Sequence, residues 1–460
     1  MCRASISEED APLYGMLLRY ARRHPARFHM PGHKGAAGPL AQVFGNALAL
    51  DVTELPETDN LFEASGAILE AERRAARLYG ARETLFSAGG STLCIQAMLR
   101  MAAGGRSAGA RVVCARNVHR AAVNAMALLG LEPEWVWPRP FAGSALPGEI
   151  RAEDVENVLA RTPGVCAVYV TSPDYYGVLS DIAGIAHAAH AYGVPLLVDN
   201  AHGAHLGAFG LHPLPFGADL CCDSAHKTLP ALTGGAFLHI ADSAPADFTR
   251  EAAKAAMALF GSTSPSYLIQ LSLDLARAWL ESEGRGAFRS LAETVASLRA
   301  LCASRGFFVP AAAFDPARLM VDTASRGVPG NAAAEFLRSR GVSPEMWDSR
   351  HVVLLPSPFN PPEDFERLAR ALSDLPLPAH SPEPYRAEPL APPCRVLPMR
   401  GALLAVHTRV RVEDAAGRVA AEAECPCPPG VPLVMPGERI SEQLVNSLKS
   451  YGVFTVNVLK

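Results

Sequence analysis

The sequence lacks the features that would indicate a membrane protein, a secreted protein or a nucleic-acid-binding protein. Its opening residues, MCRASISEED, contain no basic segment followed by an apolar one, so no signal peptide is expected. No apolar run approaches the roughly 18 residues that a membrane-spanning helix needs. Lysine and arginine total 42 against 46 aspartates and glutamates, and no basic run stands out, which argues against nucleic acid as a partner.

Charged residues are also scarce, at 19%, whereas hydrophobic residues make up 49% of the 460 positions. This composition supplies a large core and excludes global disorder, and the length predicts roughly two to four domains or subdomains. The ten cysteines are scattered, and the pairs Cys221–Cys222 and Cys425–Cys427 have no second pair at zinc-like spacing. Reduced structural thiols in a cytoplasmic protein, with no metal site, are therefore the expectation.

From about residue 61 the sequence predicts alternating helices and strands. Ala67–Tyr79 has the apolar spacing of a helix, with Gly80 as its C-cap. Short apolar runs typical of strands buried on both faces occur at Arg111–Cys114, Val165–Val170, Pro195–Val198, Ala218–Cys222 and Ala236–Ile240. Helices are expected between them at Arg120–Leu129, Ala152–Arg161 and Ile182–Tyr192. This alternation predicts an α/β fold with a mostly parallel sheet flanked by helices, in which ligands bind at the carboxyl ends of strands.

The remaining segments are predicted to form smaller parts around one large domain, residues 61–271. Residues 1–60 precede it as an N-terminal arm. Residues 272–375 are helix-rich and then mixed, which favours a smaller α+β domain. Proline crowds residues 376–395, which are expected to form a linker, and residues 396–460 a small C-terminal domain.

A lysine and an aspartate are expected to meet at the edge of the sheet. Lys227, in DSAHKTL, comes just after a predicted strand, and desolvation or a neighbouring cation lets lysine form imines with aldehydes. Asp199 ends the strand PLLV, one strand–helix excursion earlier. Alone, Lys227 would be a surface lysine and Asp199 a cap. Together they match pyridoxal 5′-phosphate (PLP), which needs a lysine for its aldehyde and a carboxylate that keeps its ring nitrogen protonated.

Two further segments carry groups that suit the phosphate and the ring of that cofactor. AGGST, residues 88–92, precedes the predicted helix Leu93–Met101, and hydroxyls at a helix N-terminus bind anions; an ordinary capped loop is the alternative. Ser224 adds a hydroxyl, and His226 is a polar neighbour of the lysine. His119, after the strand RVVC, is placed to lie on the ring, unless it is a structural histidine at a strand end.

These segments belong to a longer series of motifs. It comprises FHMPGHKG, DVTELPETDNLF, FSAGGST, RNVH, TSPDYYGVLSDI, VDNAHGAH, DSAHKTL, GSTSPSYLIQLSLD and CPPGVPLVMPGERI, in that order from Phe28 to Ile440. The series resembles the Orn/Lys/Arg decarboxylases of the aspartate-aminotransferase-like PLP fold type I, in their short form without an N-terminal receiver-like domain. The resemblance implies a three-layer fold, a cytoplasmic lyase of polyamine biosynthesis, and a homodimer or higher homo-oligomer with shared active sites rather than a decamer.

The resemblance also implies roles for single residues. Lys227 carries PLP, Asp199 pairs the ring nitrogen, His119 stacks on the ring and His202 lies near the cofactor. Residues expected to contact the cofactor, mostly on its phosphate side, are Ser91, Thr92, Ser224 and His226. Ser262 lies in a segment that such enzymes lend to the partner's site, and Asp51–Asp59 is expected to help build the entrance.

The expected reaction is decarboxylation of arginine, lysine or ornithine to its amine and CO2. It would pass through an external aldimine and a quinonoid, with Lys227 or His119 protonating Cα. Family analogy slightly favours arginine. Residues considered for reading the distal group of the substrate, with solvated loop acids as the alternative, are Glu54, Glu57 and Asp59.

Two other functions stay open from the sequence. An aminotransferase or lyase of the same fold would hold the substrate's α-carboxylate with an arginine late in the chain, and Arg318 or Arg350 would suit. A non-catalytic regulator that binds PLP or a polyamine is disfavoured by the intact Lys227, Asp199 and His119.

Three positions depart from the family pattern. Asn200 stands where Glu is usual, the helix after the Gly-Ser-Thr turn begins with Leu93–Ile95 where small and polar residues are commoner, and Cys427 stands where Tyr is usual. The first two concern cofactor geometry and the third concerns substrate entry. Lys34 also follows a histidine, but it precedes every predicted strand and has no upstream aspartate, so a gate or packing role is expected.

Overall fold

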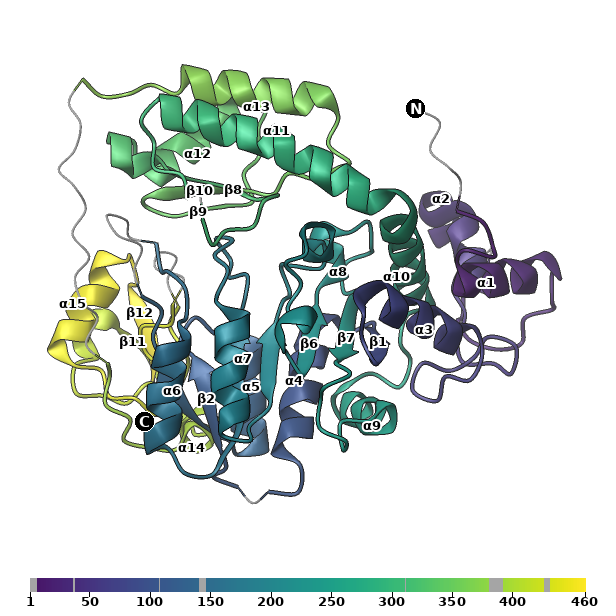
Figure 1. The fold of residues 1–460 in the computed structure, drawn as a ribbon, viewed down its shortest axis with the longest axis horizontal. Helices are drawn as coiled ribbons and strands as arrows, with labels where there is room; N and C mark the ends of the chain where they lie inside the picture. The colour runs from purple at the N-terminus through teal and green to yellow at the C-terminus, as the bar shows by residue number, and fades with distance from the viewer. Residues whose placement is uncertain are drawn as a thin grey trace. The chain divides into compact units, whose positions relative to one another are not determined.

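The computed structural model describes residues 6–35, 38–106, 108–139, 146–310, 312–379, 392–425 and 431–460. Cys427 and most of the predicted linker lie outside these residues. The chain forms two compact units, each made of two segments (Figure 1). The first unit comprises Met1–Gly104 and Pro195–Gly286, and the second comprises Gly105–Val194 and Ala287–Lys460.

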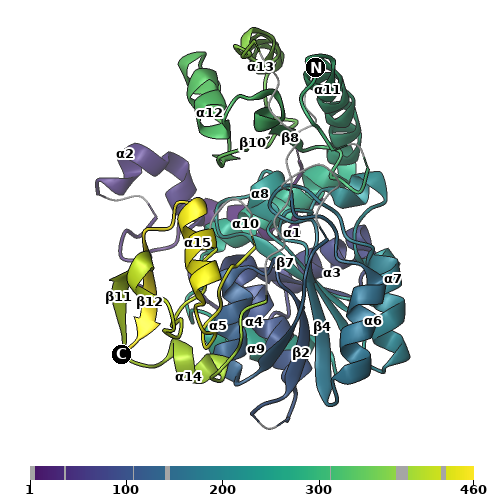
Figure 2. The ribbon, with the colours of Figure 1, turned by 90° about the vertical axis from the view of Figure 1, so that its left-hand side faces the viewer.

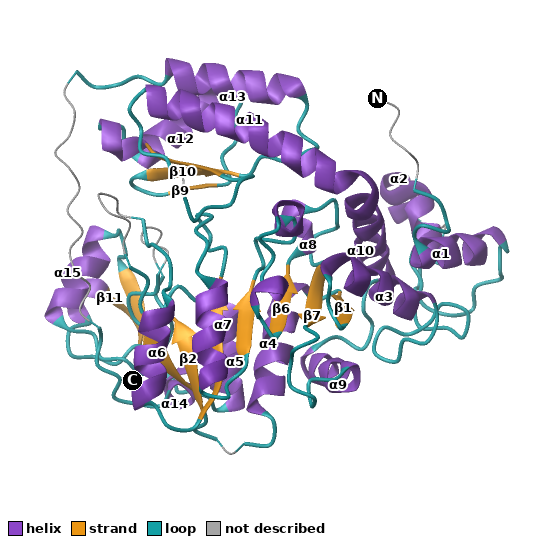
Figure 3. Ribbon diagram, viewed as in Figure 1, coloured by secondary structure: helices purple, strands orange, loops and turns teal. Residues whose placement is uncertain are grey.

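Four strands of the large sheet lie in the described part of the first unit (Figure 3). Their order is β1 (Glu83–Ser87), β7 (Ala236–Ile240), β6 (Leu220–Asp223) and β5 (Leu196–Asp199). β5 and β6 pair in parallel, whereas β7 runs antiparallel to both β6 and β1. β1, β6 and β5 therefore run in the same direction, so their carboxyl ends meet at one edge of the sheet, where β7 begins.

The helices of the first unit cover this sheet and extend beyond it. They are α1 (Pro12–Arg22), α2 (Leu40–Phe44), α3 (Ala67–Tyr79), α4 (Gly90–Ala103), α8 (Ala225–Thr228), α9 (Arg250–Phe260) and α10 (Tyr267–Trp279). Short helical turns are η1 (Gly45–Leu50), η2 (Leu206–Phe209), η3 (Leu214–Phe216) and η4 (Leu280–Gly284). α4 packs on β6 and β7 and against α9. α3 ends as predicted at Gly80, whose φ of 66° is left-handed and suits glycine.

The second unit carries the other strands of the large sheet, in the order β4 (Val165–Thr171), β2 (Arg111–Ala115) and β3 (Glu132–Val136), all parallel. Its helices next to these strands are α5 (Arg120–Leu129), α6 (Ala152–Arg161) and α7 (Ile182–Ala191). α6 and α7 lie side by side, as both views show (Figures 1 and 2). The sequence predicted α5 and α6 at their observed bounds.

Two smaller sheets follow in the second unit. The first is antiparallel, in the order β8 (Leu319–Asp322), β10 (His351–Leu354) and β9 (Met346–Trp347). The second pairs β11 (His407–Arg411) with β12 (Thr455–Leu459). The remaining helices are α11 (Arg285–Ser304), α12 (Gly330–Ser339), α13 (Pro362–Asp374), α14 (Met399–Leu403), α15 (Glu442–Ser450), η5 (Thr323–Arg326) and η6 (Val412–Asp414). Within the described ranges, no helix combines the length and the apolar character needed to cross a membrane.

Most predicted elements are present, and three of the differences bear on the large sheet and the candidate site. α4 begins at Gly90 rather than Leu93, so Ser91 and Thr92 belong to its first turn. β1 was not predicted, because ETLFS is short and begins with two polar residues. β3 was not predicted either, because its sequence, EPEWV, contains a proline and two acids. The mostly parallel α/β architecture itself is confirmed.

A buried ion pair joins the end of β2 to the C-terminal segment. Arg116 has no exposed surface, and its guanidinium donates to both oxygens of Glu438 at 2.7 and 2.8 Å. The same guanidinium lies 4.9 Å from the ring centroids of Trp135 and Trp137. Such bidentate geometry compensates the cost of removing both charges from water, provided that both partners are present.

We expect Glu438→Gln to lower the free energy of unfolding by about 3–5 kcal/mol, because the Arg116 charge stays buried without its counterion. Urea denaturation followed by circular dichroism measures this change. Asp374→Asn is the matched control, since it breaks an ion pair with Arg340 in which both side chains are half-exposed. The control should change stability by less than about 1 kcal/mol. Equal, small effects of both variants would contradict the expectation.

Candidate active site

The ends of β5 and β6 bring the predicted lysine and aspartate to one edge of the sheet. Asp199 is the last residue of β5 and pairs with Cys222 of β6. The N–H of Asn200 donates to the carbonyl of Cys222 at 3.0 Å, so the two chains stay side by side beyond the strands. Ser224 then occupies the N-cap position of α8, the single helical turn that carries Lys227, without a side-chain capping hydrogen bond.

Lys227 contacts a histidine from the turn after β5. Its Nζ lies 2.9 Å from Nε2 of His202, whose side chain is buried. One of these two nitrogens must donate and the other accept, so the amine and the imidazole are not both fully protonated in this contact. A nucleophilic lysine needs such a partner to lose and regain a proton.

Asp199 is a carboxylate held away from water, with 2% of its surface exposed. Its Oδ1 accepts from the N–H of Ala201 at 3.1 Å and lies 3.7 Å from Sγ of Cys222. Because a buried carboxylate is costly unless hydrogen-bonded or paired with a cation, its place at a strand end favours a role toward a cationic ligand group.

Hydroxyls and backbone N–H groups gather around the first turn of α4. Ser224 Oγ donates to Oγ of Ser91 at 2.8 Å. Gly90 has a left-handed φ of 68°, and its N–H donates to the carbonyl of Gly234 at 2.7 Å. His226 contacts the next carbonyl, that of Gly235, through both its N–H and its Nδ1. A helix N-terminus lined in this way suits a phosphate.

Thr92, His119 and Ser262 are not joined to this cluster by the contacts described above. Thr92 is exposed in the first turn of α4. His119 belongs to the second unit, where it caps α5 and its Nδ1 accepts from the N–H of Ala121 at 3.1 Å. Ser262 is exposed after α9, and its Oγ accepts from the N–H of Ser264. Their roles toward a cofactor stay predictions.

Other residues singled out in the sequence have structural partners. Lys34 is exposed, and its Nζ donates to the carbonyl of His29 at 2.6 Å, so its gate or packing role stays a prediction. Asp59 accepts hydrogen bonds from four backbone N–H groups, those of Asn60, Ser65, Gly66 and Ile68. This carboxylate therefore organises the loop before α3, a function that its position in an acidic stretch did not reveal. Glu57 is exposed, and Glu54 accepts from Thr53.

The two late arginines are also engaged. Arg318 is 1% exposed, donates to the carbonyl of Tyr175 at 2.8 Å and lies 3.7 Å from Asp315. Arg350 contacts both oxygens of Asp322 at 3.2 and 3.0 Å. Each guanidinium already faces a carboxylate of its own unit, which argues against either one as the grip for a substrate carboxylate.

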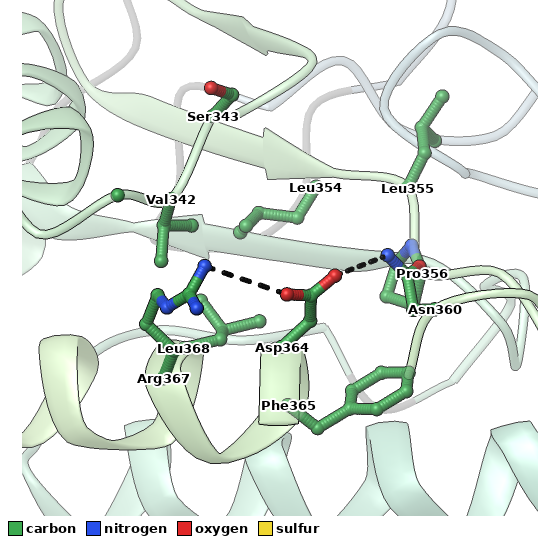
Figure 4. A pocket seen from close by; sticks show the side chains of 11 residues that line it. Val342, Ser343, Leu354, Leu355, Pro356, Asn360, Asp364, Phe365, Arg367 and Leu368 are labelled. Atoms are coloured by element: carbon green, nitrogen blue, oxygen red, sulfur yellow. Dashed lines mark hydrogen bonds and ion pairs between the residues drawn. The ribbon is translucent and has the colours of Figure 1, made fainter. Parts of the chain in front are cut away.

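A separate groove lies in the second unit, beside α13 and β10, with a volume of about 360 Å³ (Figure 4). Arg367 and Asp364 form an ion pair in it at 3.6 Å, and Asn360 contacts the same carboxylate. Both charged side chains are largely exposed. None of the predicted site residues lines this groove, so it is not the candidate active site.

Comparison with known proteins agrees with the architecture and the motifs. The profile of the Orn/Lys/Arg decarboxylase major domain matches residues 11–311, and that of the C-terminal domain of the same family matches residues 402–455. An uncharacterized protein of Bacillus subtilis, YaaO, is 32% identical over 95% of this chain and 94% of its own length. An arginine decarboxylase of the same organism is 30% identical over 96% and 93%.

A solved structure shares the fold. The lysine decarboxylase LdcF of Francisella novicida superposes with a TM-score of 0.81 and 19% identity, covering 98% of this chain and 81% of that one. At this identity the likeness concerns the fold, and the family profile carries the assignment. The profile of the major domain spans well over half of the sequence, and the chain therefore belongs to the Orn/Lys/Arg decarboxylase family.

Proposed function

We propose that this protein uses PLP to decarboxylate a basic amino acid, with arginine as the favoured substrate. The carrying observation is the contact of Lys227 with His202 at the sheet edge where the buried carboxylate of Asp199 ends β5. Arginine is favoured because four relatives that match 94–96% of the chain are named arginine decarboxylases. Two lysine decarboxylases and a further arginine decarboxylase match about three fifths of it.

The donor set at this edge fits PLP. The cofactor asks for a primary amine, an anion for its ring nitrogen and donors for its phosphate. Lys227 supplies the amine and Asp199 the anion. Ser91 and Ser224 supply hydroxyl donors at the N-terminus of α4. When bound, PLP provides an electron sink for the pair of electrons that a departing carboxylate leaves behind.

The protein's own residues then divide the remaining work. Asp199 keeps a negative charge fixed at the base of the site, where it holds a proton on a facing nitrogen. Lys227 and His202 can exchange a proton along their 2.9 Å contact, so the lysine can lose a proton to act as a nucleophile and regain one to act as an acid. His119, by resemblance alone, is proposed to lie against the ring.

The contacts of the two late arginines argue against an aminotransferase. That chemistry needs a firm hold on the substrate's α-carboxylate, whereas Arg318 and Arg350 each face an aspartate of the second unit.

A homodimer with shared sites completes the proposal. Its supports are the exposed position of Ser262 and the resemblance of the segment around it.

We expect the purified protein, supplied with PLP, to convert arginine to agmatine, measured by mass spectrometry beside parallel reactions with lysine and ornithine. Lys227→Ala should make no amine, because it removes the primary amine that is proposed to carry the cofactor. Lys449→Ala is the control, since Lys449 is an exposed lysine in the last turn of α15, and it should keep activity. A yellow, PLP-loaded protein that makes no amine from arginine, lysine or ornithine would contradict the proposal.

The carboxylate at the end of β5 can be tested separately. We expect Asp199→Asn to retain the cofactor but to lower kcat on the order of 100- to 1,000-fold, the size of losing one electrostatic partner of a reacting charge. Steady-state kinetics with a saturating amount of PLP measures the loss. Asp247→Asn removes an exposed acid of the same unit and should leave kcat unchanged. An Asp199→Asn enzyme with wild-type kcat would show that the carboxylate does not act on the cofactor.

A further inference from the structure

Behind the proposed cofactor site lies a buried polar cluster that the sequence motifs did not reveal. Its centre is Asp223, the last residue of β6, which has no exposed surface. Its Oδ2 lies 3.1 Å from Nε2 of His212 and 3.3 Å from Nε2 of His239. Its Oδ1 accepts from Nδ2 of Asn200 at 2.6 Å. The thiol of Cys221 also lies 3.8 Å from Oδ1, so four side chains converge on one carboxylate.

The hydrogen bonds assign a charge to each member of the cluster. Nδ1 of His239 lies 2.8 Å from Oγ1 of Thr84, and Nδ1 of His212 faces the N–H of Leu214 at 3.5 Å. Both rings can therefore accept at Nδ1 and donate from Nε2–H to Asp223 while staying neutral. An imidazole without a proton on Nε2 would instead point a lone pair at the carboxylate, and the two acceptors would repel each other.

The electrostatics of the cluster favour an ionised carboxyl at its centre. Burial would raise the pKa of Asp223, but the two histidines that face it hold that pKa well below its usual range. Burial lowers the pKa of His239. The ring of Tyr79 covers both histidines, with centroid distances of 4.5 and 5.1 Å. Asp223 is therefore a buried anion stabilised by the side chains that face it.

Because an ionised carboxylate can only accept, Asn200 must turn its NH2 group toward Asp223. Gly203 makes room for this amide, since a Cβ atom at position 203 would lie 2.0 Å from Oδ1 of Asn200. This pairing explains the departure from the family pattern at position 200. A glutamate there would bring a second carboxylate against Asp223, at a cost that burial makes severe.

The pair joins the two chain segments that carry the proposed chemistry. Asn200 directly follows Asp199, and Asp223 stands four residues before Lys227. We propose that Asn200 and Asp223 are a positioning pair for the cofactor site, in which one side chain must donate and the other must accept. The pair holds the ends of β5 and β6 at the spacing that sets Asp199 against the cofactor carried by Lys227. This inference rests on the proposed use of PLP.

A metal ion is the competing explanation for the cluster. The ligand atoms of His212, Asp223 and His239 lie within 4.8 Å of one another, a spacing that would also admit a cation. The contacts with Thr84 and Leu214 give both rings a hydrogen-bonding role without one. Elemental analysis of the purified holoprotein decides this point. One equivalent of a metal that disappears in His239→Ala would overturn the proposal.

The main test exchanges the two side chains in four matched holoproteins: wild type, Asn200→Asp, Asp223→Asn and the double exchange. Asn200→Asp sets two carboxylates at a hydrogen-bonding distance, so we expect PLP to bind at least about tenfold more weakly, within the range of coupling between touching residues. The double exchange reverses donor and acceptor, keeps an oxygen toward both histidines, and should recover affinity to within about threefold of wild type. Absorbance titration with PLP measures each affinity.

A second readout separates positioning from simple stabilisation. Visible circular dichroism at saturating PLP reports how the bound cofactor is held. We expect it to change in Asp223→Asn and to return in the double exchange. Asn46→Asp adds the same charge at an exposed asparagine and should alter neither measurement. If Asn200→Asp does not fold, Asp223→Asn and the double exchange still decide.

Several outcomes would overturn the pairing. A double exchange no better than the sum of its single changes would do so, as would an unchanged visible spectrum accompanied only by a lower melting temperature. Neither readout depends on turnover. A wild-type protein that binds PLP but makes no amine would therefore refute the proposed reaction and leave the positioning pair standing.

Discussion

The register between β5 and β6 is the constraint on which the proposed chemistry depends. Asp199 pairs with Cys222, and the backbone bond from Asn200 to Cys222 extends the pairing by one residue. Side chains on a strand alternate between faces, so a shift of one residue would turn Asp199 to the other side of the sheet. The position of Lys227 follows from the same register, because α8 begins directly after β6.

The core beneath this edge of the sheet contains several polar side chains. It contains the carboxylates of Asp199 and Asp223, the rings of His212 and His239, and the thiols of Cys221 and Cys222. Burial raises the pKa values of both thiols well above the usual value, and the nearby carboxylates add to this, so they stay protonated. Both carboxylates therefore lie among hydrogen-bonding side chains at the base of the candidate site.

Much of the fold was predictable because buried parallel strands are short continuous apolar runs between amphipathic helices. β4, β5, β6 and β7 were found in this way, whereas β1 and β3 carry polar residues or proline and were missed. The sequence also indicated that Lys227 and His202 lie near each other, since both belong to motifs that are close to strand ends.

The cluster behind the site was not predictable from local sequence. His239 reaches Asp223 only because β7 runs antiparallel to β6 and sets His239 opposite Cys221. His212 comes from the loop between β5 and β6, where no pattern marks it. The sequence did show that Asn200 departs from the family pattern, but the reason lies in a partner that the register brings to it.

The order of strands in the first unit has a consequence for synthesis on the ribosome. In the described sheet β1 pairs with β7, and β7 lies about 150 residues further along the chain. At typical translation rates β1 waits on the order of ten seconds before its partner exists. During that time Leu85 and Phe86, both fully buried in the finished protein, have no strand to cover them. The growing chain thus passes through a stage with an exposed apolar edge, a stage at which chaperones act on nascent proteins.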